Sequence, residues 1–155
     1  MSETVGHERP AATAVSSSAH EQGEEDRATG SAARVRLASG PLMGPVLWRV
    51  VSMVLARANW PVDRLDEALL VCDALCAHAP AYARDGRVTF SIEADEREAE
   101  LRVQDLVEGG AERLVQDAIL PVVGNVLERV ADSVSVGSDE RGEDSQLVLV
   151  LSSSS

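Results

Sequence analysis

Two short stretches of alternating apolar and polar residues, separated by a charged segment, constrain the fold of this chain most strongly. Val88, Phe90 and Ile92 alternate with polar residues, and Leu101 and Val103 do so again after the charged residues 93–100. Alternation with a period of two places the apolar side chains on one face of a strand. Two such strands joined by a polar loop predict an antiparallel hairpin, whose apolar face needs a second layer to cover it.

Two apolar stripes with helical spacing precede the hairpin and provide that layer. The first predicts a helix over residues 42–59, in which apolar residues recur every four positions. The second predicts a helix from Asp63 to Ala79, with Asp63 as its N-cap and Cys72 and Cys76 on its apolar stripe.

The remaining segments complete a two-layer domain. Residues 35–37 read as a short half-buried strand, residues 114–120 and 121–131 as helices, and residues 133–136 as a strand. The continuous apolar run 147–151 is typical of a buried strand. The sequence therefore predicts an α+β fold: a two-layer sandwich with helices on one face of a mixed, mostly antiparallel sheet.

The ends of the chain differ from this domain in composition. Residues 1–32 are poor in bulky apolar residues and contain the acidic cluster Glu24, Glu25 and Asp26. Such a segment cannot bury enough surface to offset its ordering entropy, so we expect a disordered tail that is either a solvated leader or a partner-binding arm. We place the domain at residues 33–152 and expect the serines at 153–155 to fray.

Composition excludes several classes of function. The 155 residues carry a formal charge of -12, and all 14 basic residues are Arg. Without Lys there is no P-loop lysine and no Schiff-base nucleophile. The net negative charge argues against nucleic acid and favours a basic protein partner. The Arg, Ala and Val usage suggests a high-GC bacterial genome.

The same composition suggests where the protein resides. Two cysteines suit a reducing cytosol better than a disulfide scaffold. The N-terminus lacks a signal-peptide pattern, and no apolar run approaches the roughly 20 residues that span a membrane. We expect a soluble, cytoplasmic protein without membrane contact.

Three segments carry a resemblance to a known family. Residues 61–74 form a helix-like run with Asp73 near its end, residues 101–105 form a strand that ends in Asp105, and residues 127–134 form a helix followed by a strand. Their order resembles the anti-sigma regulatory factors of the histidine-kinase-like (GHKL) ATPase superfamily, over residues 35–151. The resemblance implies the histidine-kinase-like ATPase fold. It also implies binding to a sigma factor, and in many members phosphorylation of a serine on an anti-sigma-factor antagonist.

The resemblance also implies a nucleotide site. Asp73 takes the position of the catalytic base, Asp105 that of the residue that accepts a hydrogen bond from adenine, and Gly109 and Gly110 that of the flexible loop after it. Ala77 stands where the family has an Asn that ligates Mg²⁺, and Ala has no oxygen donor.

The loops around the expected nucleotide depart from the family as well. Leu106, Val107 and Glu108 delay the glycines, and a β-branched residue opposes the left-handed backbone that Gly would permit. Pro121 and Val123 occupy the lid, where backbone N–H donors should surround phosphate. We therefore expect a degenerate ATP site with no cofactor, and ATP with Mg²⁺ only if the site functions.

Each singled-out residue has a simpler interpretation. Asp73 could be an exposed helix residue, and Asp105 could cap a turn. Cys72 and Cys76 suit apolar packing better than metal binding, because no second Cys or His pair accompanies them. A Ser52, His78 and Asp105 triad lacks the G-x-S-x-G turn of a hydrolase.

Two aromatic residues remain open to two interpretations. Trp48 on the first helix and Trp60 between the helices suit core packing or a protein interface.

The sequence thus predicts an anti-sigma-factor-like regulatory protein that sequesters a protein partner, either a sigma factor or an anti-sigma-factor antagonist. One alternative is an active ATP-dependent serine/threonine protein kinase that uses Asp73 as base and Asp105 for adenine. Another is an inert subunit that forms a dimer with an active paralogue.

Overall fold

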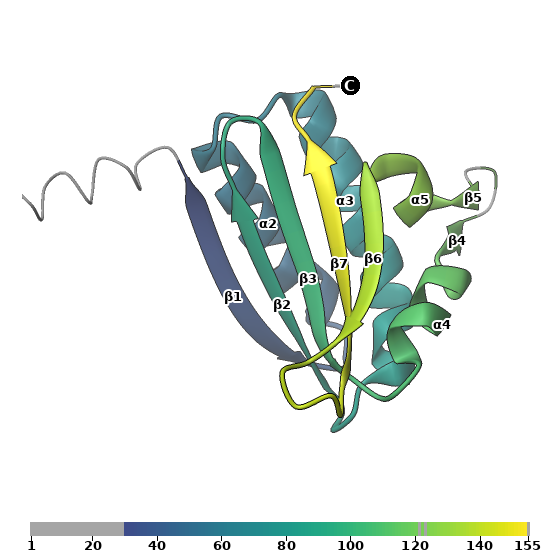
Figure 1. Ribbon diagram of the computed structural model, residues 1–155. Coiled ribbons are helices and arrows are strands. Elements are labelled where there is room, and N and C mark those ends of the chain that lie inside the picture. Colours follow the sequence, from purple (N-terminus) through teal and green to yellow (C-terminus); the bar gives the residue numbers. More distant parts are fainter. Residues whose placement is uncertain (1–29, 121, 123, 155) are drawn as a thin grey trace, which may run out of the picture.

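The computed structural model describes residues 30–120, 122 and 124–154, and within them the chain forms a five-stranded sheet with helices on one face (Figure 1). The elements in chain order are β1 (Ser31–Ala38), α2 (Met43–Arg57), α3 (Val62–His78), the 3-10 helix η1 (Ala79–Tyr82), β2 (Arg87–Ala94), β3 (Glu98–Leu106), α4 (Gly110–Asp117), β4 (Ile119–Leu120), β5 (Gly124–Asn125), α5 (Val126–Val130), β6 (Ser133–Ser138) and β7 (Ser145–Ser152).

The sheet has the order β1-β2-β3-β7-β6, and every pairing in it is antiparallel. Helices α2 and α3 lie behind it in Figure 1, and its other face is open. The predicted α+β two-layer sandwich is confirmed. The sheet is purely antiparallel in the described residues, where the sequence analysis had allowed for some parallel pairing.

The core fills the space between these two layers. Leu47, Val51 and Leu55 of α2 and Val71 and Leu75 of α3 are at most 1% exposed. They pack with the inward-facing residues of the central strands, all of them apolar: Val88, Phe90, Ile92, Leu101, Val103, Leu147 and Leu149. Since each buried side chain of this size contributes roughly 1.5–3 kcal/mol, the alternating pattern fixes which face of the sheet is covered.

The β2–β3 hairpin forms as the sequence predicts, with a tighter turn. Phe90 pairs with Val103 and Ala94 with Ala99, so only residues 95–97 lie outside the strands. The backbone N–H groups of Arg97 and Glu98 donate to Asp95 Oδ1 at 2.8 and 2.9 Å. These donors hold the pKa of Asp95 below its usual range. The turn is therefore an Asx-type turn.

Several boundaries differ from the sequence expectation for identifiable reasons. Strand β1 begins at Ser31, because the small residues before Val35 continue the pairing with β2. The N-cap of α3 is Pro61, and Asp63 lies in the first turn instead. Strand β7 is buried on one face only, since its alternate residues are half-exposed on the open face.

The lid region also differs from the prediction. The helix expected over residues 121–131 is reduced to α5, because β4 and β5 pair ahead of it. Pro121 and Val123 lie outside the described residues, as does the predicted tail up to residue 29. None of the helices in the described part of the chain is long and apolar enough to span a bilayer.

Candidate functional site

A bulge near the end of β3 determines where the Asp105 side chain points. Leu101 and Val103 face the helices, and strict alternation would turn Asp105 inward as well. The register shifts between Val103 and Leu106, and Asp105 adopts a left-handed backbone with φ 65°. The bulge thereby buries Leu106 completely and turns Asp105 to the open face. Burial of the leucine side chain stabilises the fold. Burial of an unpaired carboxylate would destabilise it by about several kcal/mol.

Polar side chains of the open face surround the Asp105 carboxylate. The hydroxyl of Thr89 on β2 donates to Asp105 Oδ2. Arg36 Nε on β1 lies 3.7 Å from the same oxygen, with both side chains partly exposed. On the side of β3 that faces β7, Gln104 Nε2 donates to Gln146 Oε1 at 3.4 Å. These contacts join β1, β2, β3 and β7 across the outer surface of the sheet.

Asp73, the second predicted site residue, lies on the solvent side of the helical layer. Its side chain is exposed, and its Oδ1 accepts a hydrogen bond from Trp48 Nε1 of α2 at 2.9 Å. Ala77, one turn further along α3, is exposed too. Trp48 is 42% exposed, so the pair forms part of the protein surface.

The structure does not bring Asp73 and Asp105 together. Asp73 lies on the outer surface of the helices and Asp105 on the outer surface of the sheet, with the hydrophobic core between them. Ala77 supplies no side-chain oxygen for Mg²⁺, and a degenerate ATP site stays a prediction.

The space between helices and sheet is filled in the region next to α2 and α3. Trp60, Ala68, Ile92 and Leu101 are among the residues that line a cavity of only about 10 Å³ there, room for at most about one water molecule. Trp60 is 6% exposed and donates to the Asp95 carbonyl at 2.8 Å, so the packing interpretation of this residue is confirmed.

Gly109 and Gly110 have structural roles at the start of α4. Gly109 is the N-cap and has φ 75°, a conformation that Gly adopts without steric cost. A Cβ on Gly110 would lie 3.1 Å from Tyr82 Cβ and 3.3 Å from Leu106 Cβ. The Ala111 N–H of this helix donates to the buried Ser145 Oγ at 2.9 Å. These contacts account for both glycines without a nucleotide, and a cofactor role for them stays a prediction.

The cysteines are packed inside the helical layer. Cys72 is fully buried, and burial, with Cys76 and Asp73 nearby, raises the pKa of its thiol far above the usual range. Burial raises the pKa of Cys76 to about 11. Both thiols therefore stay protonated at neutral pH. Among the described residues, no group of three or more His, Cys, Asp or Glu is placed to hold a metal ion.

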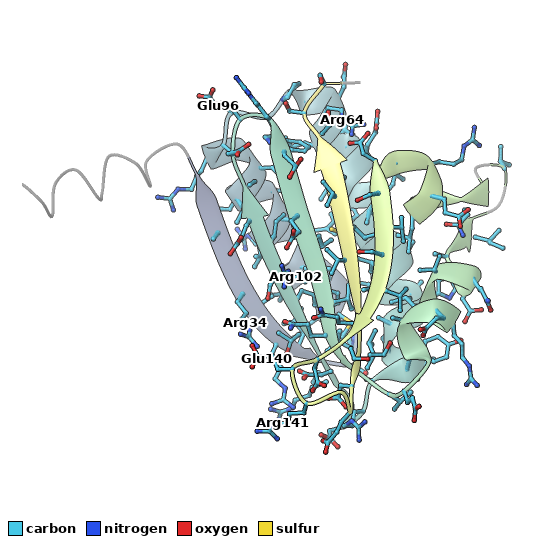
Figure 2. All side chains as sticks on the ribbon, viewed as in Figure 1. Arg34, Arg64, Glu96, Arg102, Glu140 and Arg141 are labelled. Carbon is cyan, nitrogen blue, oxygen red and sulfur yellow. The ribbon has the colours of Figure 1, made fainter. Side chains whose placement is uncertain are left out.

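The open face carries charged residues that the sequence analysis did not single out. Arg34 of β1 lies opposite Ser91 of β2, which lies opposite Arg102 of β3, so that two arginines flank one hydroxyl (Figure 2). One row further towards the hairpin, Glu93 pairs with Glu100. The period-two pattern of β1 places Arg34 and Arg36 on the face opposite to Val35. The sequence alone was therefore enough to predict these outward-facing arginines.

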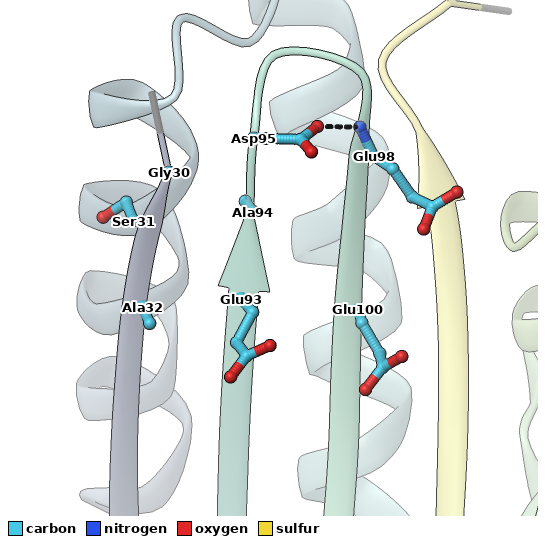
Figure 3. A pocket seen from close by; sticks show the side chains of 8 residues that line it. All are labelled: Gly30, Ser31, Ala32, Glu93, Ala94, Asp95, Glu98 and Glu100. Atoms are coloured by element: carbon cyan, nitrogen blue, oxygen red, sulfur yellow. Dashed lines mark hydrogen bonds between the residues drawn. The ribbon is translucent and has the colours of Figure 1, made fainter. Parts of the chain in front are cut away.

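The acidic row continues into a concavity at the hairpin end of the sheet. Glu93, Asp95, Glu98 and Glu100 line it together with residues 30–32, and its volume is about 550 Å³ (Figure 3). The open face is thus divided into a basic part and an acidic part.

No protein-family model matches the chain, and no curated protein matches it. Among solved structures, one chain in the crystal structure of the SiaB-SiaC complex from Pseudomonas aeruginosa is similar, with 11% sequence identity and a TM-score of 0.49. The likeness covers 86% of this chain and 96% of that chain.

Proposed function

We propose that this chain is a regulatory protein that acts by binding other proteins, in the manner of an anti-sigma factor, and that it performs no ATP-dependent phosphorylation. The observation that carries the proposal is the separation of Asp73 and Asp105 onto opposite surfaces of the domain. A kinase of this type needs its base, metal and nucleotide in one site, because phosphoryl transfer depends on positioning and charge stabilisation.

The surface chemistry supports binding to protein. On the helical layer, Trp48 is 42% exposed and donates a hydrogen bond to Asp73. Leu70, three residues before Asp73 on α3, is 39% exposed. A half-exposed Trp held by a hydrogen bond is already ordered, so binding through it costs little side-chain entropy. The formal charge of -12 favours a basic face on the partner, such as that of a sigma factor.

Affinity capture with the full-length protein, followed by reconstitution, tests the proposal. The tagged chain is used to capture partners from an extract of its own host with and without ATP, and any captured sigma factor is purified. We expect the chain to inhibit transcription directed by that sigma factor at a one-to-one ratio without ATP. Capture of a kinase-like paralogue alone would favour the inert dimerisation partner instead, and ATP-dependent phosphorylation of a captured antagonist would favour the kinase.

A further inference from the structure

Strand β1 is an edge of the sheet that no described segment covers. It pairs with β2 over its full length from Ser31 to Ala38, and the sheet ends there. Every second residue of an antiparallel edge strand directs its N–H and C=O away from its neighbour, so these groups remain available for a further strand. In Figure 1 no described helix or strand lies beside β1 on the side away from β2.

The opposite edge is less accessible. Strand β6 forms the other end of the sheet order, but α4 and α5 pack against it and extend past it in Figure 1. A strand added to β6 would have to fit beside these helices. The β1 edge has α2 behind it and nothing described beside it.

The side chains of β1 select what can pair with it. Arg34 and Arg36 point to the open face, whereas Val35 and Leu37 point towards the helices and are half-buried. If two copies of β1 paired in antiparallel fashion about residue 34 or residue 35, Arg34 of one copy would face Arg34 or Arg36 of the other. Like charges opposite each other are destabilising, so β1 disfavours pairing with a second copy of itself.

The charges around Arg34 favour an acidic strand. Arg34 forms no ion pair with any described residue, whereas Arg102, two strands away in the same row, pairs with Glu100. Arg36 is only 3.7 Å from Asp105 at a partly exposed site, where an ion pair is weak. Nearer the hairpin the sign reverses, since Ala32 lies beside Glu93. Acidic side chains of a partner strand would therefore lie next to residues 34–36 of β1 and not next to Ala32.

We propose that the β1 edge binds an extended acidic segment of a partner protein, which adds to the sheet as a sixth strand. Two acidic side chains at alternate positions pair with Arg34 and Arg36 on the open face. The residues that alternate with these two acidic residues are apolar and cover Val35 and Leu37. The inference rests on the proposed function and adds a local contact to it: the overall charge of -12 favours a partner with a basic face, whereas the arginines of the β1 edge bind an acidic strand of that partner.

Peptide binding to the full-length protein tests the proposal. The probe is a fluorescent peptide of about ten residues in which Glu alternates with Val and Thr, and the control has Lys in place of Glu. We expect at least about tenfold tighter binding of the Glu peptide, reversed in the double variant Arg34→Glu/Arg36→Glu. Binding should weaken from about 0.05 to about 0.5 M salt, because exposed charges are screened. The Glu peptide with alternate amides N-methylated should not bind.

Matched variants show whether the right surface is used. Arg57→Glu reverses an exposed arginine on α2 and should leave peptide binding unchanged. Amide NMR shifts caused by the Glu peptide should be largest in β1. Equal binding of both peptides, no binding, or shifts centred on β6 or the helices would overturn the proposal.

The chain's own acidic cluster is an alternative occupant. If Glu24→Gln/Glu25→Gln/Asp26→Asn shifts the β1 amides without peptide, that cluster occupies the edge and the partner strand is ruled out. A sigma factor that binds wild type and the Arg34→Glu/Arg36→Glu variant equally well would contradict only the β1 inference. The proposed function would then stand without it.

Discussion

The hydrogen bond from Thr89 to Asp105 ties the β3 bulge to the open face, and a double-mutant cycle across this pair measures it. The four proteins are wild type, Thr89→Val, Asp105→Ala and the double variant. Thr89 is 3% exposed, so its hydroxyl depends on Asp105 as acceptor. Thr89→Val removes the hydroxyl while keeping a β-branched side chain of similar shape in the strand.

The expected energies come from two separate effects. Asp105→Ala leaves the Thr89 hydroxyl without its acceptor, at a cost of about 1–3 kcal/mol, and the lower half of that range applies because Asp105 is 36% exposed. Ala also has to adopt the backbone with φ 65°, which costs about 1–2 kcal/mol more. In the Thr89→Val background only the backbone cost remains. We therefore expect a coupling of about 1–2 kcal/mol between the two positions.

Urea unfolding at neutral pH, followed by circular dichroism, gives the free energy of unfolding for each protein. Asp105→Asn serves as the control, because Asn retains an acceptor and tolerates the left-handed backbone; its cost should stay below about 1 kcal/mol. If Asp105→Ala costs the same in both backgrounds, the Thr89 contact does not hold the bulge. The placement of Asp105 on the open face would then be in doubt.

Other predictions concern packing and pH. Gly110→Ala should destabilise the fold by about 1–3 kcal/mol, because the added Cβ would lie 3.1 Å from Tyr82 Cβ. The control Gly44→Ala, whose Cβ would have nothing within 4 Å, should be neutral or slightly stabilising. Equal urea midpoints for the two variants would contradict the close packing at Gly110. The melting temperature should fall from about pH 8 to about pH 10.5, because the raised pKa values of Cys72 and Cys76 let the unfolded chain lose those protons first. Cys76→Ala should make this decline shallower, and an unchanged slope would count against the burial of that thiol.

The layers of the fold could be predicted from the sequence because its apolar periods are long and regular. The stripes of α2 and α3 and the alternation in β2 and β3 each repeat over several turns or residue pairs, and burial follows them. The region after α4 could not be predicted in the same way. Short strands such as β4 and β5 have two residues each, too few to show a period.

The candidate site was harder to predict because one residue of register decides it. Alternation through Leu101 and Val103 points Asp105 inward, and only the burial of Leu106 reveals the bulge that turns Asp105 outward. A sequence shows no signal for a bulge of this kind beyond an Asp that tolerates the left-handed backbone. Asp73 is exposed on α3, as its simpler interpretation as a helix surface residue predicts, and its role as a catalytic base stays a prediction.

Nucleotide binding tests the central claim most directly. Calorimetric titration of the full-length protein with ATP and Mg²⁺, repeated with Asp105→Asn, asks whether the two separated aspartates serve a common site. We predict no saturable heat of binding for either protein. Micromolar affinity for ATP in wild type, lost in Asp105→Asn, would contradict the account and restore the kinase interpretation.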